Sequence, residues 1–383
     1  MQEHICNHIL FKPWRLAAAT FWLVLAFVCM PEEARATYLV FTMEVCQTCQ
    51  ADFEATWDGK DYGPRFLAEK LEQYALKGTF FVNSLCPPSL VDRGLSNMTL
   101  LVSSGHDIEL HPHPDVVDPS RPLLTMYSTE ERKKILETAI DNIRRAGAPP
   151  PIAYRAADYS IDRKTFSLLP EFGIGMDSSI FPGDSRGDIQ FSENLVNRFV
   201  PMGRVYELPI TMIRRAPFIG YAGMAALDID KTIWEEQESA LKQIAERGLP
   251  VATYFINFTS FYHHIRATTP YEPHKVTAPN KKNISKLDNV LKLVTSDNRF
   301  KVVTAKELWR LHQERPQELE GLSFVPYTGL WFTYVKSWKH FVGHSIENKI
   351  VAMAPIVLML SMSIGALFLL KRRGYAVRKR SES

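Results

Sequence analysis

The stretch GHDIELHPHPD, residues 105–115, decides the fold. Apolar and acidic residues alternate over residues 107–110, which is the pattern of a β-strand. Two histidines, His111 and His113, follow directly after this strand, and strand alternation puts both on one side, where they can reach one ion. In α/β folds, reactive side chains gather just past the C-terminal ends of parallel strands. The stretch therefore predicts an α/β fold with a functional site at this strand end.

The same kind of strand recurs on both sides of this stretch. Short apolar runs alternate with amphipathic helical stretches, which is typical of parallel strands joined by crossover helices. Ser128 and Glu131 form a capping box that opens a helix running to Arg145. We expect one barrel-like domain over residues 37–312, with strands at residues 38–41, 78–82, 107–110, 152–154, 174–176, 205–210, 251–256 and 301–303.

Further polar residues follow other predicted strands. Glu44 and Cys46 come after the first strand, Arg155 after the fourth and Asp177 after the fifth. Because the C-terminal ends of parallel strands meet at one edge of the sheet, we expect these side chains to lie near His111.

The N-terminal segment has the layout of an export signal. Residues 16–30 are uncharged and apolar, follow Lys12 and Arg15, and precede the small residues Ala34 and Ala36. This order predicts a secretory signal over residues 1–36 that is cleaved after Ala36. An uncleaved signal anchor is the alternative, and both place most of the chain outside the cytoplasm.

The C-terminal segment predicts a membrane anchor. Residues 350–370 carry no charge over a length that spans a hydrocarbon core of about 30 Å. Residues 371–383 are rich in arginine and lysine, which predicts a cytoplasmic tail by the positive-inside rule, and residues 313–349 form a stalk. We expect a single-pass protein of the cell membrane whose domain is extracytoplasmic, in the periplasm or outside the cell.

The net charge and the cysteine content indicate which binding partners the domain can have and which cellular compartment it occupies. The net charge of +3 comes from the basic tail, so the domain has no basic face and nucleic acid is excluded as a partner. Cys46, Cys49 and Cys86 remain once the leader is set aside. An oxidising compartment makes a disulfide between Cys46 and Cys49, or between Cys49 and Cys86, the expectation.

Several segments in order resemble one family. Residues 78–82 (GTFFV) and 105–111 (GHDIELH) are similar to the Ala-Thr-Phe-Phe-Val and Gly-His-Glu-Ile-Gly-x-His signatures of polysaccharide deacetylases, the NodB-homology or carbohydrate esterase family four group. Later segments that also resemble the family are Tyr154-Arg155, 173–179 (GIGMDSS), 207–210 (ELPI) and 300–308 (FKVVTAKEL). The resemblance covers residues 37–312.

This resemblance implies a fold, a reaction and a cofactor. The fold is a distorted (β/α) barrel. The reaction removes N-acetyl or related acyl groups from amino sugars of a polysaccharide or lipid-linked glycan, with one divalent metal held by an Asp and two His. Amide hydrolysis of this kind needs a polarised carbonyl, a group that takes a proton from water and a donor for the leaving amine.

The resemblance assigns roles to the residues after the first strand. Glu44 falls where the family has its general base, and Cys46 falls at the metal carboxylate position. A thiolate ligand favours zinc over magnesium. In the alternative, Cys46 and Cys49 form a disulfide or pack, and Glu44 itself binds the metal.

The later strands supply the other roles. His111 matches the first metal histidine, and Asp115 stands where the second usually lies, with His113 nearby, so all three are candidate ligands. Arg155 is placed to pair with the base and Asp177 to hold that arginine. The alternative for these two is a buried structural salt bridge.

One position departs from the family. Relatives have a general-acid histidine where this chain has Asn257, and His263, His264 and His274 lie in the loop that follows. Two further functions therefore stay open: a catalytically inactive glycan-binding or assembly protein, and a deformylase or deacylase for a lipid-linked sugar.

Overall fold

The structure is a computed structural model that describes residues 36–46, 49, 53, 55–181, 189, 196–215, 223–265, 275–321 and 323–329. The predicted transmembrane helix and tail, and all of the predicted signal segment except Ala36, lie outside these ranges. None of the helices in the described ranges is long and apolar enough to cross a membrane.

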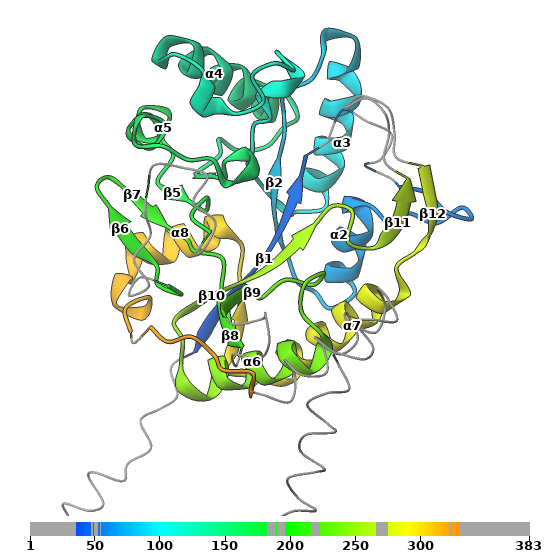
Figure 1. The fold of residues 1–383 in the computed structure, drawn as a ribbon, viewed down its shortest axis with the longest axis vertical. Helices are drawn as coiled ribbons and strands as arrows, with labels where there is room; N and C mark the ends of the chain where they lie inside the picture. Colours follow the sequence, from blue (N-terminus) through cyan, green and yellow to red (C-terminus); the bar gives the residue numbers. More distant parts are fainter. Residues whose placement is uncertain are drawn as a thin grey trace, which may run out of the picture.

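A nine-stranded sheet forms the centre of the domain, with strand order β10-β1-β2-β3-β4-β5-β7-β6, and β13 pairs with the start of β1 (Figure 1). All neighbours are parallel except β6 and β7. Two antiparallel hairpins, β8–β9 and β11–β12, lie beside it. The strands are β1 (Thr37–Val45), β2 (Thr79–Val82), β3 (Asp107–Leu110), β4 (Ala153–Tyr154), β5 (Met176–Asp177), β6 (Val200–Met202), β7 (Val205–Glu207), β8 (Met212–Arg215), β9 (Gly223–Ala226), β10 (Val251–Asn257), β11 (Tyr262–Ile265), β12 (Lys275–Pro279) and β13 (Phe300–Val302).

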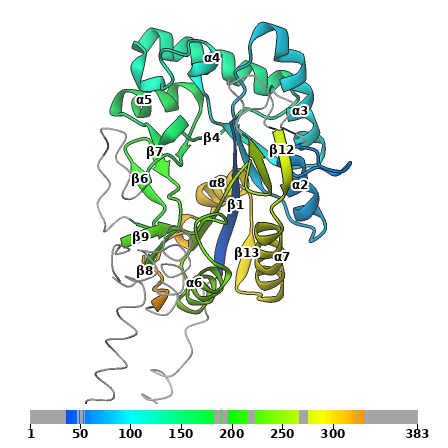
Figure 2. The ribbon, with the colours of Figure 1, turned by 45° about the vertical axis from the view of Figure 1, so that its right-hand side comes forward.

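Helices lie around the strands, as Figure 2 shows in a view turned by 45° from that of Figure 1. Neighbouring helices contact one another in the pairs α2–α3, α3–α4, α4–α5 and α6–α7. The predicted capping box is confirmed, because Ser128 accepts from the Glu131 amide and Glu131 accepts from the Ser128 amide. The helices are α2 (Pro64–Glu72), α3 (Val91–Ser103), α4 (Thr129–Arg145), α5 (Arg163–Leu168), α6 (Trp234–Arg247), α7 (Lys281–Ser296) and α8 (Ala305–Glu314).

The two faces of the sheet are distinct along β1. Leu39, Phe41 and Met43 belong to the main apolar cluster, together with residues of α2 and α7. Tyr38 and Val40 cluster instead with Leu308 and Leu311 of α8, so α8 covers the other face near the strand starts. Because side chains alternate along a strand, Thr42 and Glu44 continue this second face towards the strand ends. We call it the inner face.

The sheet curls as the predicted distorted barrel would, but the hydrogen-bonded ladder between strands does not close into a complete ring in the described residues. In the described residues, β10 and β7 are not paired as strands. The chain after β7 meets β10 through two threonines, where each backbone amide donates to the hydroxyl of the other, Thr211 to Thr253 at 2.8 Å and Thr253 to Thr211 at 2.7 Å. The Phe255 amide then donates to the Leu227 carbonyl at 3.0 Å. Side-chain hydroxyls thus bridge the gap in the barrel.

One helix and two hairpins were not predicted from the sequence. Helix α3 contains Gly94 and several Ser, Thr and Asn residues, which are poor helix formers. Packing of its buried face, which includes Met98 and Leu101, outweighs that weak propensity. The hairpins β8–β9 and β11–β12 lie outside the main sheet. The sequence analysis predicted a loop for the second of these stretches and no element for the first.

The Cys49–Cys86 disulfide is the second of the two predicted pairings, and Cys46 is a free thiol. The bridge joins the loop after β1 to the loop after β2. It also constrains α3, because a Cβ on Gly94 would lie 2.5 Å from the Cys86 sulfur. The alternative in which Cys46 pairs with Cys49 is therefore wrong, and the Cys46 thiol stays available at the end of β1.

Removing the bridge in the double variant Cys49→Ser/Cys86→Ser is expected to lower the free energy of unfolding by about 2 to 5 kcal/mol, because the unfolded chain gains freedom over a long closed loop. Urea denaturation of the oxidised protein measures it. In the metal-free protein, Cys46→Ser is the matched control and should leave the midpoint nearly unchanged. Equal losses in the two variants would contradict this assignment of the bridge.

Candidate metal centre and active site

Three potential metal ligands converge at the strand ends. Cys46 directly follows β1, and His111 and His113 follow β3. The His111 and His113 Nε2 atoms are 3.0 Å apart, and the Cys46 sulfur lies 3.6 Å from His111 Nε2. One ligand atom from each residue falls within 4.8 Å of the other two. A single ion can therefore contact all three.

The second nitrogen of each histidine is already engaged. His111 Nδ1 lies 2.8 Å from the Arg155 carbonyl, and His113 Nδ1 lies 3.7 Å from the Asp115 carboxylate. Partners of this kind fix the ring orientation and leave Nε2 for a metal. The structure thus places Asp115 behind His113 and outside the group of three, whereas the sequence suggested it as a direct ligand.

The charge states of these residues suit a metal site. Burial, and then the proximity of His113, keeps the pKa of His111 well below its usual range, so the ring is neutral. Burial also lowers the pKa of His113. Burial, and then the charge of Glu44, raises the pKa of the Cys46 thiol. A divalent cation reverses this last effect, because a coordinating thiol is deprotonated. One sulfur and two imidazole nitrogens are a donor set that zinc accepts, with a fourth position open.

Glu44 lies beside the group of three, on the inner face. Its carboxylate is buried, and Oε1 lies 3.7 Å from Arg155 Nη1. Oε1 accepts no hydrogen bond from the described residues. Burial raises the pKa of Glu44, while the charge of Arg155 and a hydrogen bond from Tyr159 oppose that rise. A buried carboxylate oxygen that accepts no hydrogen bond is free to receive a proton.

Arg155 is fully buried and is held by groups of the inner face. Its Nε donates to the Ser178 carbonyl at 3.0 Å, and its Nη2 donates to the Ser178 hydroxyl at 2.8 Å. The guanidinium also lies over the Phe81 ring, 4.2 Å from the centroid. Buried charges need such partners, and here they orient the cation towards Glu44.

The expected contact between Arg155 and Asp177 is replaced by the Ser178 contacts. Tyr154 and Asp177 are in register across β4 and β5, so Arg155 faces the same side as Ser178. Asp177 accepts instead from the Ser179 hydroxyl at 2.6 Å and from the Ser179 amide at 3.1 Å. Asp177 directly precedes Ser178 in the chain, so its side chain points to the face of the sheet opposite to the one that Arg155 occupies.

Two residues near Glu44 were missed by the sequence analysis. Tyr159 lies close enough to Glu44 to oppose the rise of its pKa, and both Tyr159 and Asp158 have left-handed backbones, with φ of 55° and 51°. Left-handed non-glycine residues cost energy and cluster at functional sites. Asp228 pairs with Phe255 of β10, and its charge raises the pKa of Glu44. No short motif marks either residue, although Tyr159 lies only five residues after the end of β4.

The side chain of Asn257 stabilises a turn of the backbone through hydrogen bonds to Thr259. Its side-chain oxygen accepts from the Thr259 amide at 3.1 Å and the Thr259 hydroxyl at 2.8 Å. His263 and His264 lie on β11, where His263 is exposed and His264 lies near the Tyr262 ring. His274 is outside the described residues. Among the described residues, the group of ligand atoms that could share one ion includes neither His263 nor His264.

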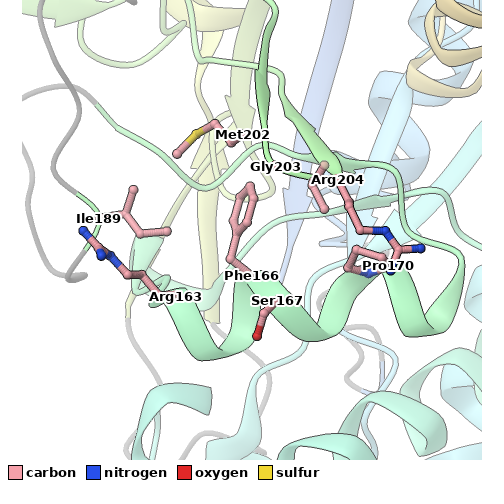
Figure 3. Close-up of a pocket in the computed structure, with 9 residues that line it drawn as sticks. Arg163, Phe166, Ser167, Pro170, Ile189, Met202, Gly203 and Arg204 are labelled. Carbon is pink, nitrogen blue, oxygen red and sulfur yellow. The ribbon is translucent and has the colours of Figure 1, made fainter.

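A cavity of about 780 Å³ lies elsewhere in the domain (Figure 3). Phe166 and Pro170 project into it from one side, and Met202 and Arg204 line the other. It adjoins the start of β7, whereas the candidate centre follows the last residues of β1 and β3. The cavity is therefore at the opposite end of the parallel strands and is separate from the candidate centre.

Comparison with known protein families finds no family that matches this sequence, and comparison with curated proteins finds no relative. Solved structures similar to this chain include several polysaccharide and peptidoglycan deacetylases. A protein described as a polysaccharide deacetylase from Mycobacterium smegmatis is 16% identical, with a TM-score of 0.45, covering 77% of this chain and 95% of that one.

Two further similar structures are a deacetylase and a protein described as a pseudoenzyme. The peptidoglycan deacetylase PdaC from Bacillus subtilis is 14% identical with a TM-score of 0.37, covering 75% of this chain and 96% of that one. A mutant of a CE4 family pseudoenzyme is 12% identical with a TM-score of 0.40, covering 72% of this chain and 68% of that one. These values are low, so the roles of the site residues are inferred from their geometry.

Replacing Asp228 by Asn is expected to stabilise the protein at pH 7.5. Burial, and then the charge of Asp230, raises the pKa of Asp228 to about 6. The folded-state pKa is above the unfolded one, so the charged form is disfavoured on folding at any pH above about 6, and this cost disappears below about 4. Asn keeps the oxygen that accepts from the Asp230 amide. The gain at pH 7.5 should be about 2 to 3 kcal/mol at most.

Urea denaturation at pH 7.5 and pH 4 tests this. The control is Asp118→Asn, because hydrogen bonds from Ser120 and Arg121 lower the pKa of the partly exposed Asp118 to about 2. Its effect at pH 7.5 should have the opposite sign. A destabilised Asp228→Asn protein at pH 7.5 would show that the carboxylate charge itself supports the fold.

Proposed function

We propose that this protein is a metal-dependent hydrolase that removes N-acyl groups, of the acetyl type, from amino sugars of a surface or lipid-linked polysaccharide. The observation that carries the proposal is the meeting of Cys46, His111 and His113 beside Glu44, whose buried Oε1 accepts no hydrogen bond from the described residues. Ligands for one ion and a neighbouring proton acceptor are the two parts that metal-assisted amide hydrolysis requires.

Zinc is the metal that fits the donor set. A thiolate and two imidazoles are soft or borderline ligands that suit zinc and disfavour magnesium or calcium. Bound there, a zinc ion would supply a Lewis acid for the amide carbonyl and lower the pKa of water. With Asp115 behind His113, the three ligands leave a fourth position open, which is the arrangement of catalytic rather than structural zinc sites.

The chain's own residues divide the remaining work. Glu44 Oε1 takes a proton from the attacking water, and Arg155 keeps the carboxylate oriented towards it. Since Asn257 supplies no imidazole, Glu44 is also the group placed to return that proton to the leaving amine. Burial raises the pKa of Glu44, and a raised pKa suits a carboxyl group that must both accept and donate near neutrality. Tyr159 lies close to Glu44 and partly opposes the rise of its pKa.

We also propose that the domain works outside the cytoplasm, held at the cell membrane by residues 350–370. The hydropathy of these residues and the basic segment after them support this location. The Cys49–Cys86 disulfide supports it independently, because such bonds persist in oxidising compartments. A polysaccharide of the cell envelope or a lipid-linked glycan is the substrate class that an anchored enzyme of this kind would meet.

A second candidate function rests on one observation. Asn257 stands where the resembled family has a catalytic histidine. Its side-chain oxygen accepts hydrogen bonds from the Thr259 amide and hydroxyl. A protein that keeps the centre and cannot complete turnover would bind glycans or act in their assembly. The two functions differ in turnover, and metal content alone does not separate them.

The test uses the full-length protein in detergent, loaded with zinc. We expect about one zinc per chain and release of acetate from N-acetylated amino-sugar oligomers. His111→Ala should lose both, because a ligand is removed. Glu44→Gln should keep the zinc and lose at least about 100-fold in turnover, since general acid–base catalysis contributes about 10² to 10⁴.

The possible failures separate the candidate functions. Zinc bound without acyl release from any N-acylated sugar would favour the glycan-binding protein. A wild-type protein that binds no zinc and releases no acyl group would refute the proposed hydrolase. Glu44→Gln with full turnover would remove Glu44 from the mechanism.

A further inference from the structure

Asn83 lies between the two strands that carry the candidate ligands. It is the first residue after β2, which sits between β1 and β3 in the sheet, and it is 1% exposed. Cys46 follows β1 on one side, and His111 and His113 follow β3 on the other. The side chain of Asn83 therefore lies between the two ligand-bearing loops.

The backbone ladder ends just before Asn83. The Asn83 amide donates to the Val45 carbonyl at 2.9 Å, and the His111 amide donates to the Val82 carbonyl at 2.9 Å. Beyond these bonds the strands separate, so their backbones no longer pair directly. Cys46 and His113 both lie in the part of the chain that has left the ladder.

The carboxamide of Asn83 continues the ladder in both directions. Its Nδ2 donates to the Cys46 carbonyl at 3.1 Å, and its Oδ1 accepts from the His113 amide at 3.1 Å and the Leu85 amide at 3.2 Å. A carboxamide has the donor and acceptor of a peptide group, so it can replace one at this position. Asn83 therefore joins the backbone of Cys46 to the backbone of His113.

The three ligands are held in two ways. His111 is oriented by the Arg155 carbonyl, which does not involve Asn83. Cys46 and His113 come from different strands, and Asn83 is the residue that bonds to both backbones. The disulfide between Cys49 and Cys86 joins the same two loops after β1 and β2, three residues further along each.

We propose that Asn83 is a positioning residue of the metal centre, which fixes the Cys46 sulfur and the His113 imidazole at the spacing that one ion requires. This rests on the metal site in the proposed function. Side chains that support metal ligands commonly change metal affinity by about 10- to 100-fold when they are replaced. Asn is the residue type that fits, because Asp lacks the donor for Cys46 and Leu lacks both functions.

The test measures metal binding by the full-length protein in detergent, without any assay of turnover. Cobalt(II) replaces zinc, because its absorption spectrum reports thiolate coordination through a charge-transfer band. Zinc affinity is measured by competition with a coloured chelator. The variants are Asn83→Asp, which keeps the acceptor for His113 and Leu85 and loses the donor for Cys46, and Asn83→Ala, which loses all three bonds.

The matched control is Asn142→Asp. Asn142 is also buried, and its Nδ2 donates at 2.9 Å to the carbonyl of Ser84, the residue next to Asn83. Its side-chain hydrogen bonds are to Ser84 and Arg145, and neither of these residues carries a candidate ligand. A general loss of packing around this loop would affect both asparagines alike, and thermal unfolding of each variant shows how large that loss is.

We expect Asn83→Asp to lower zinc affinity by about 10- to 100-fold and to weaken the thiolate band of the cobalt protein, while Asn142→Asp stays within about threefold of the wild type. Equal affinities and spectra in these two variants would overturn the role of Asn83. If Asn83→Ala does not fold, Asn83→Asp alone decides the outcome, because it retains two of the three bonds. A wild-type protein without zinc would instead refute the metal site of the proposed function, which keeps the two failures distinct.

Discussion

The parallel ladder of β1, β2 and β3 fixes where each strand ends, and the candidate centre depends on that alignment. Val45 of β1 pairs with Val82 of β2, which pairs with Leu110 of β3, so the three strands finish at one level. The next residues along the chain are Cys46, Asn83 and His111. Alternation places Glu44, Cys46 and His111 on the inner face. A shift of one residue in either pairing would turn these side chains outwards and disperse the centre.

Burial of Arg155 is the second constraint on the site. A cation with no exposure is costly unless its hydrogen bonds are satisfied. Ser178, Thr42 and the ring of Phe81 meet it on the inner face, and Glu44 supplies the opposite charge. The same arginine offers its carbonyl to His111. One residue therefore orients both a candidate ligand and the candidate base, which ties the metal centre to the carboxylate.

Local patterns in the sequence predicted the parts of the fold that depend on local rules. The strand Asp107–Leu110 and the capped helix Thr129–Arg145 have the predicted bounds, because alternation and capping act over a few residues. The strand-end positions of Cys46, His111 and His113 likewise led to their grouping. The predicted signal and membrane segments lie in chain that the structure does not describe, and they stay predictions.

Features that depend on pairing between distant strands could not be predicted in this way. The face of Asp177 depends on its register with Tyr154, which no local pattern reveals. Helix α3 forms despite its weak helix propensity because its buried face packs against the rest of the domain. Tyr159 comes close to Glu44 through a left-handed turn, a backbone conformation that favours glycine, asparagine and aspartate. The roles of Asn83 and Ser178 likewise appear only once neighbouring strands are in place.

The central claim is that one sulfur and two histidine nitrogens of this chain bind a single divalent ion. X-ray absorption at the zinc edge on the zinc-loaded, full-length protein tests it most directly. The account predicts one sulfur at about 2.3 Å and two imidazole nitrogens at about 2.0 to 2.1 Å, with a light atom completing the shell. A zinc shell without sulfur, or no zinc bound in stoichiometric amount, would contradict it.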